Sequence, residues 1–105
     1  MTRSGHGLVP PSQPTPSAEV LDLSVIDRQP VLRCNARTLH VFSHGSAATA
    51  AAASPAQVIR QAFAKALVPY YPLAGRLKLG STDHPRLQIE CSGEGIWLVE
   101  ANADC

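Results

Sequence analysis

Histidines are the first side chains in this sequence whose spacing suggests chemistry. His40 and His44 lie four positions apart, which on a helix would direct both imidazoles at one metal ion. The segment around them, residues 37–46, instead predicts a strand that runs into a glycine turn. A zinc site needs three or four converging ligands, and neither an acidic partner nor a third ligand is near in the sequence. We therefore favour an ordinary structural role, with one histidine half-buried and the other exposed, over a metal site.

Patterns for nucleophilic catalysis and cofactor binding are also missing. The sequence contains no G-x-S-x-G motif and no catalytic-cysteine signature, so we expect Cys34 to be a partly buried, inert thiol. Gly93 and Gly95 match only the first half of G-x-G-x-x-G, because Leu98 occupies the place of the last glycine. We expect no bound cofactor. These residues alone predict a soluble α/β protein without an identifiable active site, and a small metal or nucleotide binder is the least favoured class.

Composition excludes several other classes. The chain has 105 residues, enough for one domain at most. Nine basic and eight acidic side chains leave a net charge of +1, which argues against binding to nucleic acid or to an anionic membrane surface. No stretch approaches the roughly 20 apolar residues of a membrane span. Three widely spaced cysteines fit reduced thiols better than disulfides, so we expect a cytoplasmic protein.

Two regions of different character follow one another along the chain. Residues 1–18 are rich in glycine, proline and serine. Prolines fix φ and push the preceding residue into an extended conformation, so we expect an extended arm here and no helix. Residues 19–105 are expected to form part of one domain. Within it, the alanine-rich residues 43–53 are too few to hold a helix without packing, and we interpret them as a variable loop.

Apolar alternation predicts four strands. Residues 20–26 place two leucines and a valine on one face, and residues 38–42 are β-branched and aromatic. Residues 86–90 and 96–100 flank a turn at 92–95, whose two glycines tolerate positive φ, so we expect a β-hairpin there. With the helix described next, the order strand, strand, helix, strand, strand predicts an α/β or α+β fold.

The clearest predicted element is a helix from Ser54 to about Leu67. Ser54 can act as N-cap, Pro55 suits the first helical position, and Gln57 completes an S-x-x-Q capping box. Pro69 ends or kinks the helix. An apolar stripe runs along one side of this helix, and we expect the opposite, polar side to face water. The stripe consists of Val58, Ile59, Ala62, Phe63, Ala66, Leu67 and Tyr70, and the polar side of Gln57, Arg60, Gln61 and Lys65.

Several motifs carry a resemblance to a known family. Residues 70–77 read Y-Y-P-L-A-G-R-L, residues 91–95 read C-S-G-E-G, and residues 99–104 read V-E-A-N-A-D. Together with the opening P-T-P and L-S-x-x-D segments, they resemble the N-terminal part of the BAHD plant acyl-CoA-dependent acyltransferases. The similarity is greatest to members that act with benzoyl- or hydroxycinnamoyl-CoA and alcohols. It covers nearly the whole chain, with residues 43–53 as the family's variable loop.

The resemblance implies a fold and a reaction. The fold would be the N-terminal part of a chloramphenicol-acetyltransferase-like two-domain α/β fold. The reaction would transfer an acyl group from acyl-CoA, a co-substrate, to an alcohol or amine, with the histidine of H-x-x-x-D as general base. That motif does not occur in these 105 residues. We therefore expect an inactive N-terminal fragment that carries no catalytic residue.

By the same resemblance, one strand borders the acceptor channel. Asn35, Thr38 and His40 lie on the matching segment and are the candidate substrate-binding residues, with Thr38 and His40 on one strand face. Their interpretation as ordinary polar residues of a structural strand stays open. Gly75 and Arg76 are assigned to the fold: the glycine would relieve a backbone constraint, and the arginine would pair or cap locally.

A second class of function is a non-catalytic interaction module from a truncated gene. A partial sheet would leave unpaired strand edges and an uncovered helix stripe, and such surfaces bind partners or aggregate. A monomeric chain that melts cooperatively would support an independent module, whereas aggregation would support an incomplete domain. In either class we expect no obligate protein partner, no nucleic acid and no membrane.

Overall fold

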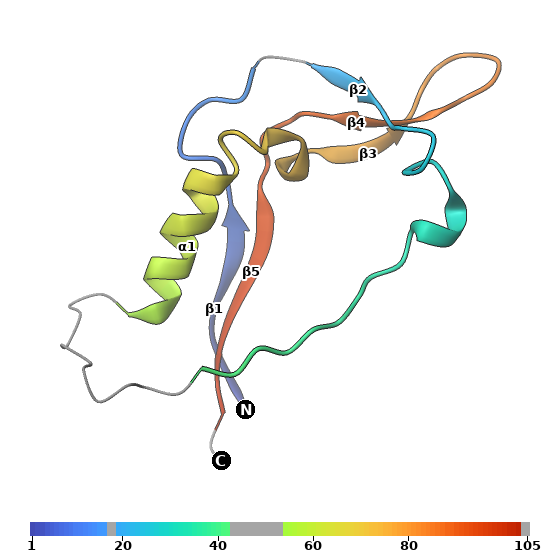
Figure 1. Cartoon of the computed structure of the whole chain (residues 1–105). Coiled ribbons are helices and arrows are strands. Elements are labelled where there is room, and N and C mark those ends of the chain that lie inside the picture. Colours follow the sequence, from blue (N-terminus) through green and yellow to red (C-terminus); the bar gives the residue numbers. More distant parts are fainter. Residues whose placement is uncertain (17–18, 43–53, 104–105) are drawn as a thin grey trace.

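Two small antiparallel sheets organise the computed structural model, which describes residues 1–16, 19–42 and 54–103 (Figure 1). In chain order the elements are β1 (Thr2–Val9), β2 (Val20–Asp22), the 3₁₀ turn η1 (Pro30–Leu32), the helix α1 (Pro55–Ala66), the 3₁₀ turn η2 (Tyr71–Ala74), β3 (Arg76–Leu79), β4 (Leu87–Glu90) and β5 (Ile96–Asn102). One sheet pairs β1 with β5, and the other has the strand order β2-β4-β3. Mixed strands with one main helix agree with the predicted α/β class.

Helix α1 begins where the sequence predicts. The Ser54 hydroxyl accepts a hydrogen bond from the backbone N–H of Gln57 at 3.3 Å, and Pro55 is the first helical residue. Leu67 is the C-cap, two positions before Pro69. The predicted start and end of the helix are therefore confirmed. In the described part of the chain, no helix has both the length and the apolar character needed to cross a bilayer.

The face through which α1 packs differs from the prediction. The backbone N–H of Ser12, just after β1, donates to the Ala64 carbonyl at 2.8 Å. The half-buried residues of the helix are Ala56, Arg60 and Ala64, whereas Phe63 of the predicted stripe is 40% exposed. Apart from Leu67, which is buried, the apolar stripe is uncovered, as expected of a partial sheet, whereas Arg60 of the predicted polar side is half-buried. Small alanines let the helix lie close to the chain beside it, and the larger apolar side chains point elsewhere.

The predicted C-terminal β-hairpin is also wrong. β4 pairs with β2 on one side and β3 on the other, so both of its edges are occupied. β5 pairs instead with β1, which offers a longer ladder from Thr2↔Asn102 to Val9↔Ile96. Residues 91–95 form a corner that leads from one sheet to the other. Gly93 and Gly95 have φ values of 68° and 98° there. The predicted use of these glycines at positive φ is therefore confirmed.

β1 lies within the predicted extended arm. Val9 is buried and Gly5 and Gly7 are half-buried, while His6 and Leu8 are exposed. The His6 ring lies 5.5 Å from the Trp97 ring across the ladder. The extended conformation was predicted, but the pairing with the far end of the chain was not, because glycine-rich residues carry little strand signal.

The two strands predicted in residues 20–26 and 38–42 are reduced or missing. β2 keeps only three residues, because Ser24 and Asp27 form a turn in which the serine hydroxyl donates to the carboxylate at 2.7 Å. Residues 38–42 form no strand, and Phe42 is 88% exposed. Within the described structure, this segment pairs with neither of the two sheets. The variable loop 43–53, with His44, lies outside the described residues.

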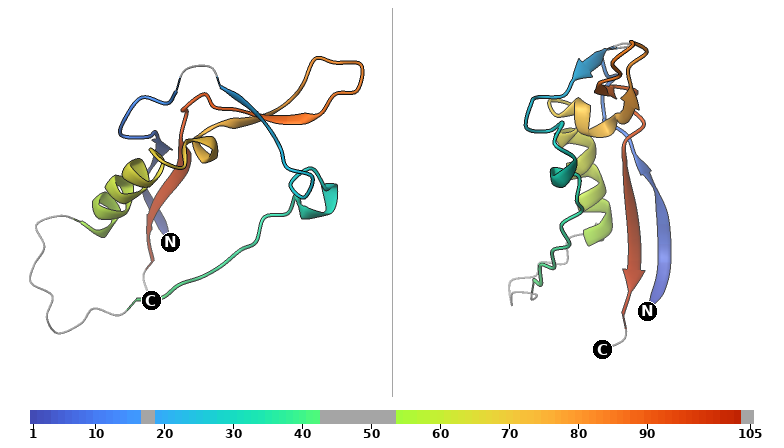
Figure 2. Two further views of the ribbon diagram at one scale, coloured as in Figure 1. Left: turned by 45° about the horizontal axis from the view of Figure 1, so that its top comes forward. Right: turned by 90° about the vertical axis from the view of Figure 1, so that its right-hand side faces the viewer.

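Few apolar side chains are buried in the described structure. The core residues are Val9, Leu67, Ala74 and Cys91. The radius of gyration is 17.6 Å, compared with about 13 Å for a compact domain of about 100 residues. The two sheets and the helix thus form an open framework (Figures 1 and 2). Many large apolar side chains in the described residues are exposed.

Candidate functional site

An apolar groove lies between the β2-β4-β3 sheet and the segment that follows η1. It encloses about 480 Å³, within the range of small-molecule pockets. Five of its ten lining residues are leucines, which come from both the sheet and the turns. Its apolar residues are Leu23, Leu32, Leu73, Leu77, Leu87 and Ile89, and its polar ones are Asp27, Arg33, Cys34 and Asn35. We call this site the leucine groove.

Of the three predicted substrate-binding residues, one lines this groove and two do not. Asn35 lines it, so one of the three lies at a hollow that could hold a ligand. Thr38 and His40 are exposed on the extended segment beyond and are not part of its lining. The structure therefore does not bring the three side chains together, and their role in binding stays a prediction. Among the described residues, no group of three or more histidine, cysteine, aspartate or glutamate side chains could hold a metal ion.

Arg76 joins the two motifs that carry the family resemblance. Its Nη1 donates to the carbonyl oxygens of Gly75 at 2.8 Å and Gly95 at 3.0 Å. Its Nε lies 3.0 Å from a carboxylate oxygen of Glu94. The backbone N–H of Gly95 donates to the Ala74 carbonyl at 3.0 Å. We call this set, residues 74–76 with 94–95, the Arg76 corner, and its role is to hold the chain where it passes between the sheets.

Two glycines allow the backbone to approach closely at this corner. A Cβ on Gly95 would overlap the carbonyl oxygen of Val9 at the end of β1, and the positive φ also disfavours any side chain. A Cβ on Gly75 would overlap the carbonyl oxygen of Glu90 in β4. Both motif glycines therefore serve packing, which supports the assignment of Gly75 and Arg76 to the fold.

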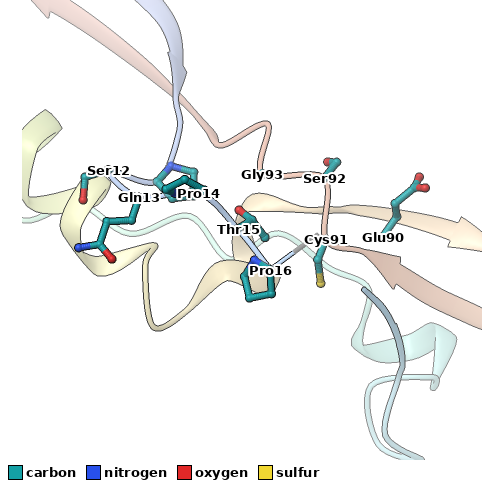
Figure 3. Close-up of a pocket in the computed structure, with 10 residues that line it drawn as sticks. Ser12, Gln13, Pro14, Thr15, Pro16, Glu90, Cys91, Ser92 and Gly93 are labelled. Atoms are coloured by element: carbon teal, nitrogen blue, oxygen red, sulfur yellow. The ribbon is translucent and has the colours of Figure 1, made fainter. Parts of the chain in front are cut away.

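A second hollow, of about 560 Å³, lies between residues 11–16 and residues 90–93 (Figure 3). The proline-rich segment runs beside the 91–95 corner there, and Thr15 lies so close to Gly93 that a Cβ on the glycine would meet its hydroxyl oxygen at 2.6 Å. Cys91 is 3% exposed. Burial, and then the nearby Glu19 carboxylate, raises the pKa of its thiol. Because the thiolate is the nucleophilic form of cysteine, the raised pKa disfavours a nucleophilic role for Cys91.

A hydrogen bond between Tyr71 and Glu19 was not predicted. The Tyr71 hydroxyl donates to the Glu19 carboxylate at 2.6 Å. This hydrogen bond, with burial and the negative charges of Glu19 and Cys91, raises the pKa of the tyrosine. It ties the turn η2 to the residue before β2. The residues are 52 positions apart, so no local sequence pattern could have paired them.

Comparison with known proteins places the whole chain in one group. A protein-family model described as Transferase family matches residues 1–105. A myricetin 3-O-glucosyl 1,2-rhamnoside 6'-O-caffeoyltransferase of Crocosmia x crocosmiiflora is 47% identical over 106 residues, which cover 100% of this chain and 23% of the relative. Acyl transferase 4 of Oryza sativa subsp. japonica is 46% identical over 108 residues, covering 100% of this chain and 25% of the relative.

The name of a third relative gives benzyl alcohol as the acceptor. The benzyl alcohol O-benzoyltransferase of Petunia hybrida is 41% identical over 97 residues, which cover 92% of this chain and 20% of the relative. The chain thus spans about a quarter or less of the length of these curated relatives.

Proposed function

Because the chain belongs to the Transferase family, the plant acyltransferases that its motifs resemble, we propose that it is part of an enzyme that transfers an acyl group from acyl-CoA to an alcohol or amine. The observation that carries this proposal is the Arg76 corner. The residues that carry the resemblance meet there through hydrogen bonds, although they come from motifs on either side of the β3–β4 hairpin. Contacts between the shared motifs are expected if these motifs have the same structural role in this chain as in the relatives.

Within this proposal, residues 19–105 form part of a two-domain fold like that of chloramphenicol acetyltransferase. Residues 1–18 are an extended arm that adds β1, and residues 43–53 are the variable loop. The three widely spaced cysteines favour the cytoplasm as its location.

The proposed chemistry needs a base that these 105 residues do not supply. The acceptor oxygen or nitrogen would attack the thioester carbonyl carbon, the carbon–sulfur bond would break, and CoA would leave as a thiol. A general base must take the acceptor proton. None of the four histidines is followed four positions later by aspartate, as H-x-x-x-D requires. We therefore propose that this chain is inactive alone and that Asn35, Thr38 and His40 form part of the acceptor-channel wall.

A hybrid enzyme tests the proposal. The chain would replace the matched residues of the Petunia hybrida relative, and CoA release from benzoyl-CoA would be followed with benzyl alcohol as acceptor. We expect turnover by the hybrid and none by the 105-residue chain. Asn35→Ala and His40→Ala in the hybrid should raise the KM for the alcohol more than that for benzoyl-CoA. Acyl transfer by the chain alone, or a folded hybrid without turnover, would contradict the proposal.

The second candidate, a non-catalytic interaction module, is favoured by the exposed apolar side chains of α1 and of residues 39–42. Surfaces of this kind usually mark interaction sites or cause aggregation. Size-exclusion chromatography and calorimetry of the chain distinguish the two cases. A monomer with a cooperative melting transition would favour the module, whereas aggregation would favour an incomplete acyltransferase domain.

A further inference from the structure

Two hydroxyl residues of the sequence, Thr15 and Ser54, are directly followed by proline. Proline fixes its own φ and disfavours the helical conformation at the residue before it, so an extended backbone is favoured at both positions. Proline-directed protein kinases recognise a hydroxyl residue in this setting. These two residues are therefore the candidates for such a modification, and the structure places them in very different surroundings.

Thr15 lies where the proline-rich segment passes the 91–95 corner (Figure 3). Its side chain is half-buried, whereas Pro14 and Pro16 on either side of it are exposed. A Cβ on Gly93 would meet its hydroxyl oxygen at 2.6 Å, so the corner closely approaches this side of the threonine. The hydroxyl forms no hydrogen bond with the described residues. It could therefore be modified without breaking such a bond.

Residues 13–16 are attached to the framework by hydrogen bonds on either side of them. Before them, the backbone N–H of Ser12 donates to the Ala64 carbonyl at 2.8 Å. After them, the Glu19 carbonyl accepts from the backbone N–H of Cys91 at 3.0 Å. Residues 13–16 themselves form no hydrogen bond with the described part of the chain. A segment with so few hydrogen bonds opens locally at a low free-energy cost, and opening presents its threonine to a kinase.

The hollow beside Thr15 suits a hydroxyl better than a phosphate. Among the described residues that line it, Glu90 is the one charged side chain, and it is a carboxylate. A phosphate on threonine carries a charge of about −1.5 to −2 at pH 7, is stabilised by cations or N–H groups and is repelled by carboxylates. A phosphate on Thr15 would therefore be more stable in water than in this hollow.

We propose that Thr15 is a phosphorylation site for a proline-directed protein kinase, and that the phosphate releases residues 11–16 from the 91–95 corner. The threonine oxygen attacks the γ-phosphorus of ATP, the bond from that phosphorus to the bridging oxygen breaks, ADP leaves, and the hydroxyl proton passes to a base of the kinase. Transfer requires the segment to lift, and the phosphate then opposes its return. The modification thus shifts the population towards the released form, independently of the proposed acyl transfer.

Treatment of the chain with a mitogen-activated protein kinase and magnesium ATP tests the inference. Mass spectrometry of peptides locates the phosphate, and hydrogen exchange at the Ser12 amide reports whether the segment is attached. We expect phosphate on Thr15 and an exchange rate at Ser12 that is roughly tenfold higher than in the untreated chain, because release breaks the hydrogen bond to the Ala64 carbonyl.

Thr15→Val is the matched control, because valine has the same branched shape and no hydroxyl to modify. The treated variant can still carry phosphate on Ser54, the N-cap of α1, where the N–H groups at the start of the helix favour a negative charge. Its exchange rate at Ser12 should change by less than about twofold on treatment. Absence of phosphate from Thr15 would overturn the inference, as would phosphate on Thr15 without faster exchange at Ser12 or equally faster exchange in the treated Thr15→Val chain.

Discussion

Arg76 and Glu94 lie on either side of the β3–β4 hairpin and are joined by a 3.0 Å contact between Nε and a carboxylate oxygen. Both side chains are about half exposed, so the ion pair alone contributes little to stability. The hydrogen bonds from the same guanidinium to the carbonyls of Gly75 and Gly95 contribute more, because a charged donor strengthens them. Arg76 thus acts chiefly as a backbone clamp at the corner where the chain changes sheets.

Removing this clamp should loosen the corner. Arg76→Ala is expected to raise hydrogen exchange at the Gly95 amide by about tenfold, the equivalent of about 1.4 kcal/mol, because two carbonyls lose a charged donor. Lys78→Ala, which breaks only the exposed Lys78–Glu90 ion pair, is the control and should change exchange less than threefold. Equal exchange rates in the two variants would contradict the clamp.

Gly95 and Gly7 provide a second matched pair. Gly95→Ala should separate β1 from β5, because the new Cβ would overlap the Val9 carbonyl oxygen and the residue has positive φ. Gly7→Ala, also within reach of β5, places its Cβ in open space and should preserve the ladder. Amide nuclear magnetic resonance shifts along β5 measure both effects. Unchanged β5 shifts in Gly95→Ala would show that the crossing is not as close as described.

The Tyr71–Glu19 hydrogen bond predicts a dependence on alkaline pH. The folded pKa of Tyr71 is raised above its ordinary value of 10.0, so the contact stabilises the fold fully below pH 10. This stabilisation is lost as the pH rises through the folded pKa. Glu19→Ala should lower the pKa of Tyr71 towards 10.0. Absorbance titration of tyrosinate in a Tyr70→Phe background measures the pKa, and the same pKa with and without Glu19 would contradict the assignment.

Cys34 and Cys91 should react very differently with an alkylating reagent. Cys34 is exposed, so the expectation that it is partly buried is wrong, whereas Cys91 is buried and has a raised pKa. Iodoacetamide at pH 8 should therefore modify Cys34 at least tenfold faster, because the thiolate is the reacting species. In concentrated urea the difference should disappear. Peptide mapping by mass spectrometry separates the two sites, and fast modification of Cys91 without denaturant would show that it is not buried.

Local features of the fold could be predicted from the sequence alone. The serine cap and proline at the start of α1, the end of the helix near Pro69 and the positive φ of Gly93 and Gly95 each depend on neighbouring residues. The family motifs also predicted structural roles for Gly75 and Arg76, which their contacts support. Backbone sterics and capping act over a few residues, so the pattern that encodes them is visible in the chain itself.

Tertiary structure decided which elements pair and which faces are covered. Periodicity identified the apolar stripe of α1 but could not specify its neighbour, and Ala64 rather than Phe63 lies against the chain. β5 found its partner in β1, at the other end of the sequence, instead of forming the predicted hairpin with β4. Asn35 came to line a groove that Thr38 and His40 do not reach. Strand pairing and burial depend on which distant segments pack well against each other and on which strand edges are free. A local sequence pattern does not specify these contacts.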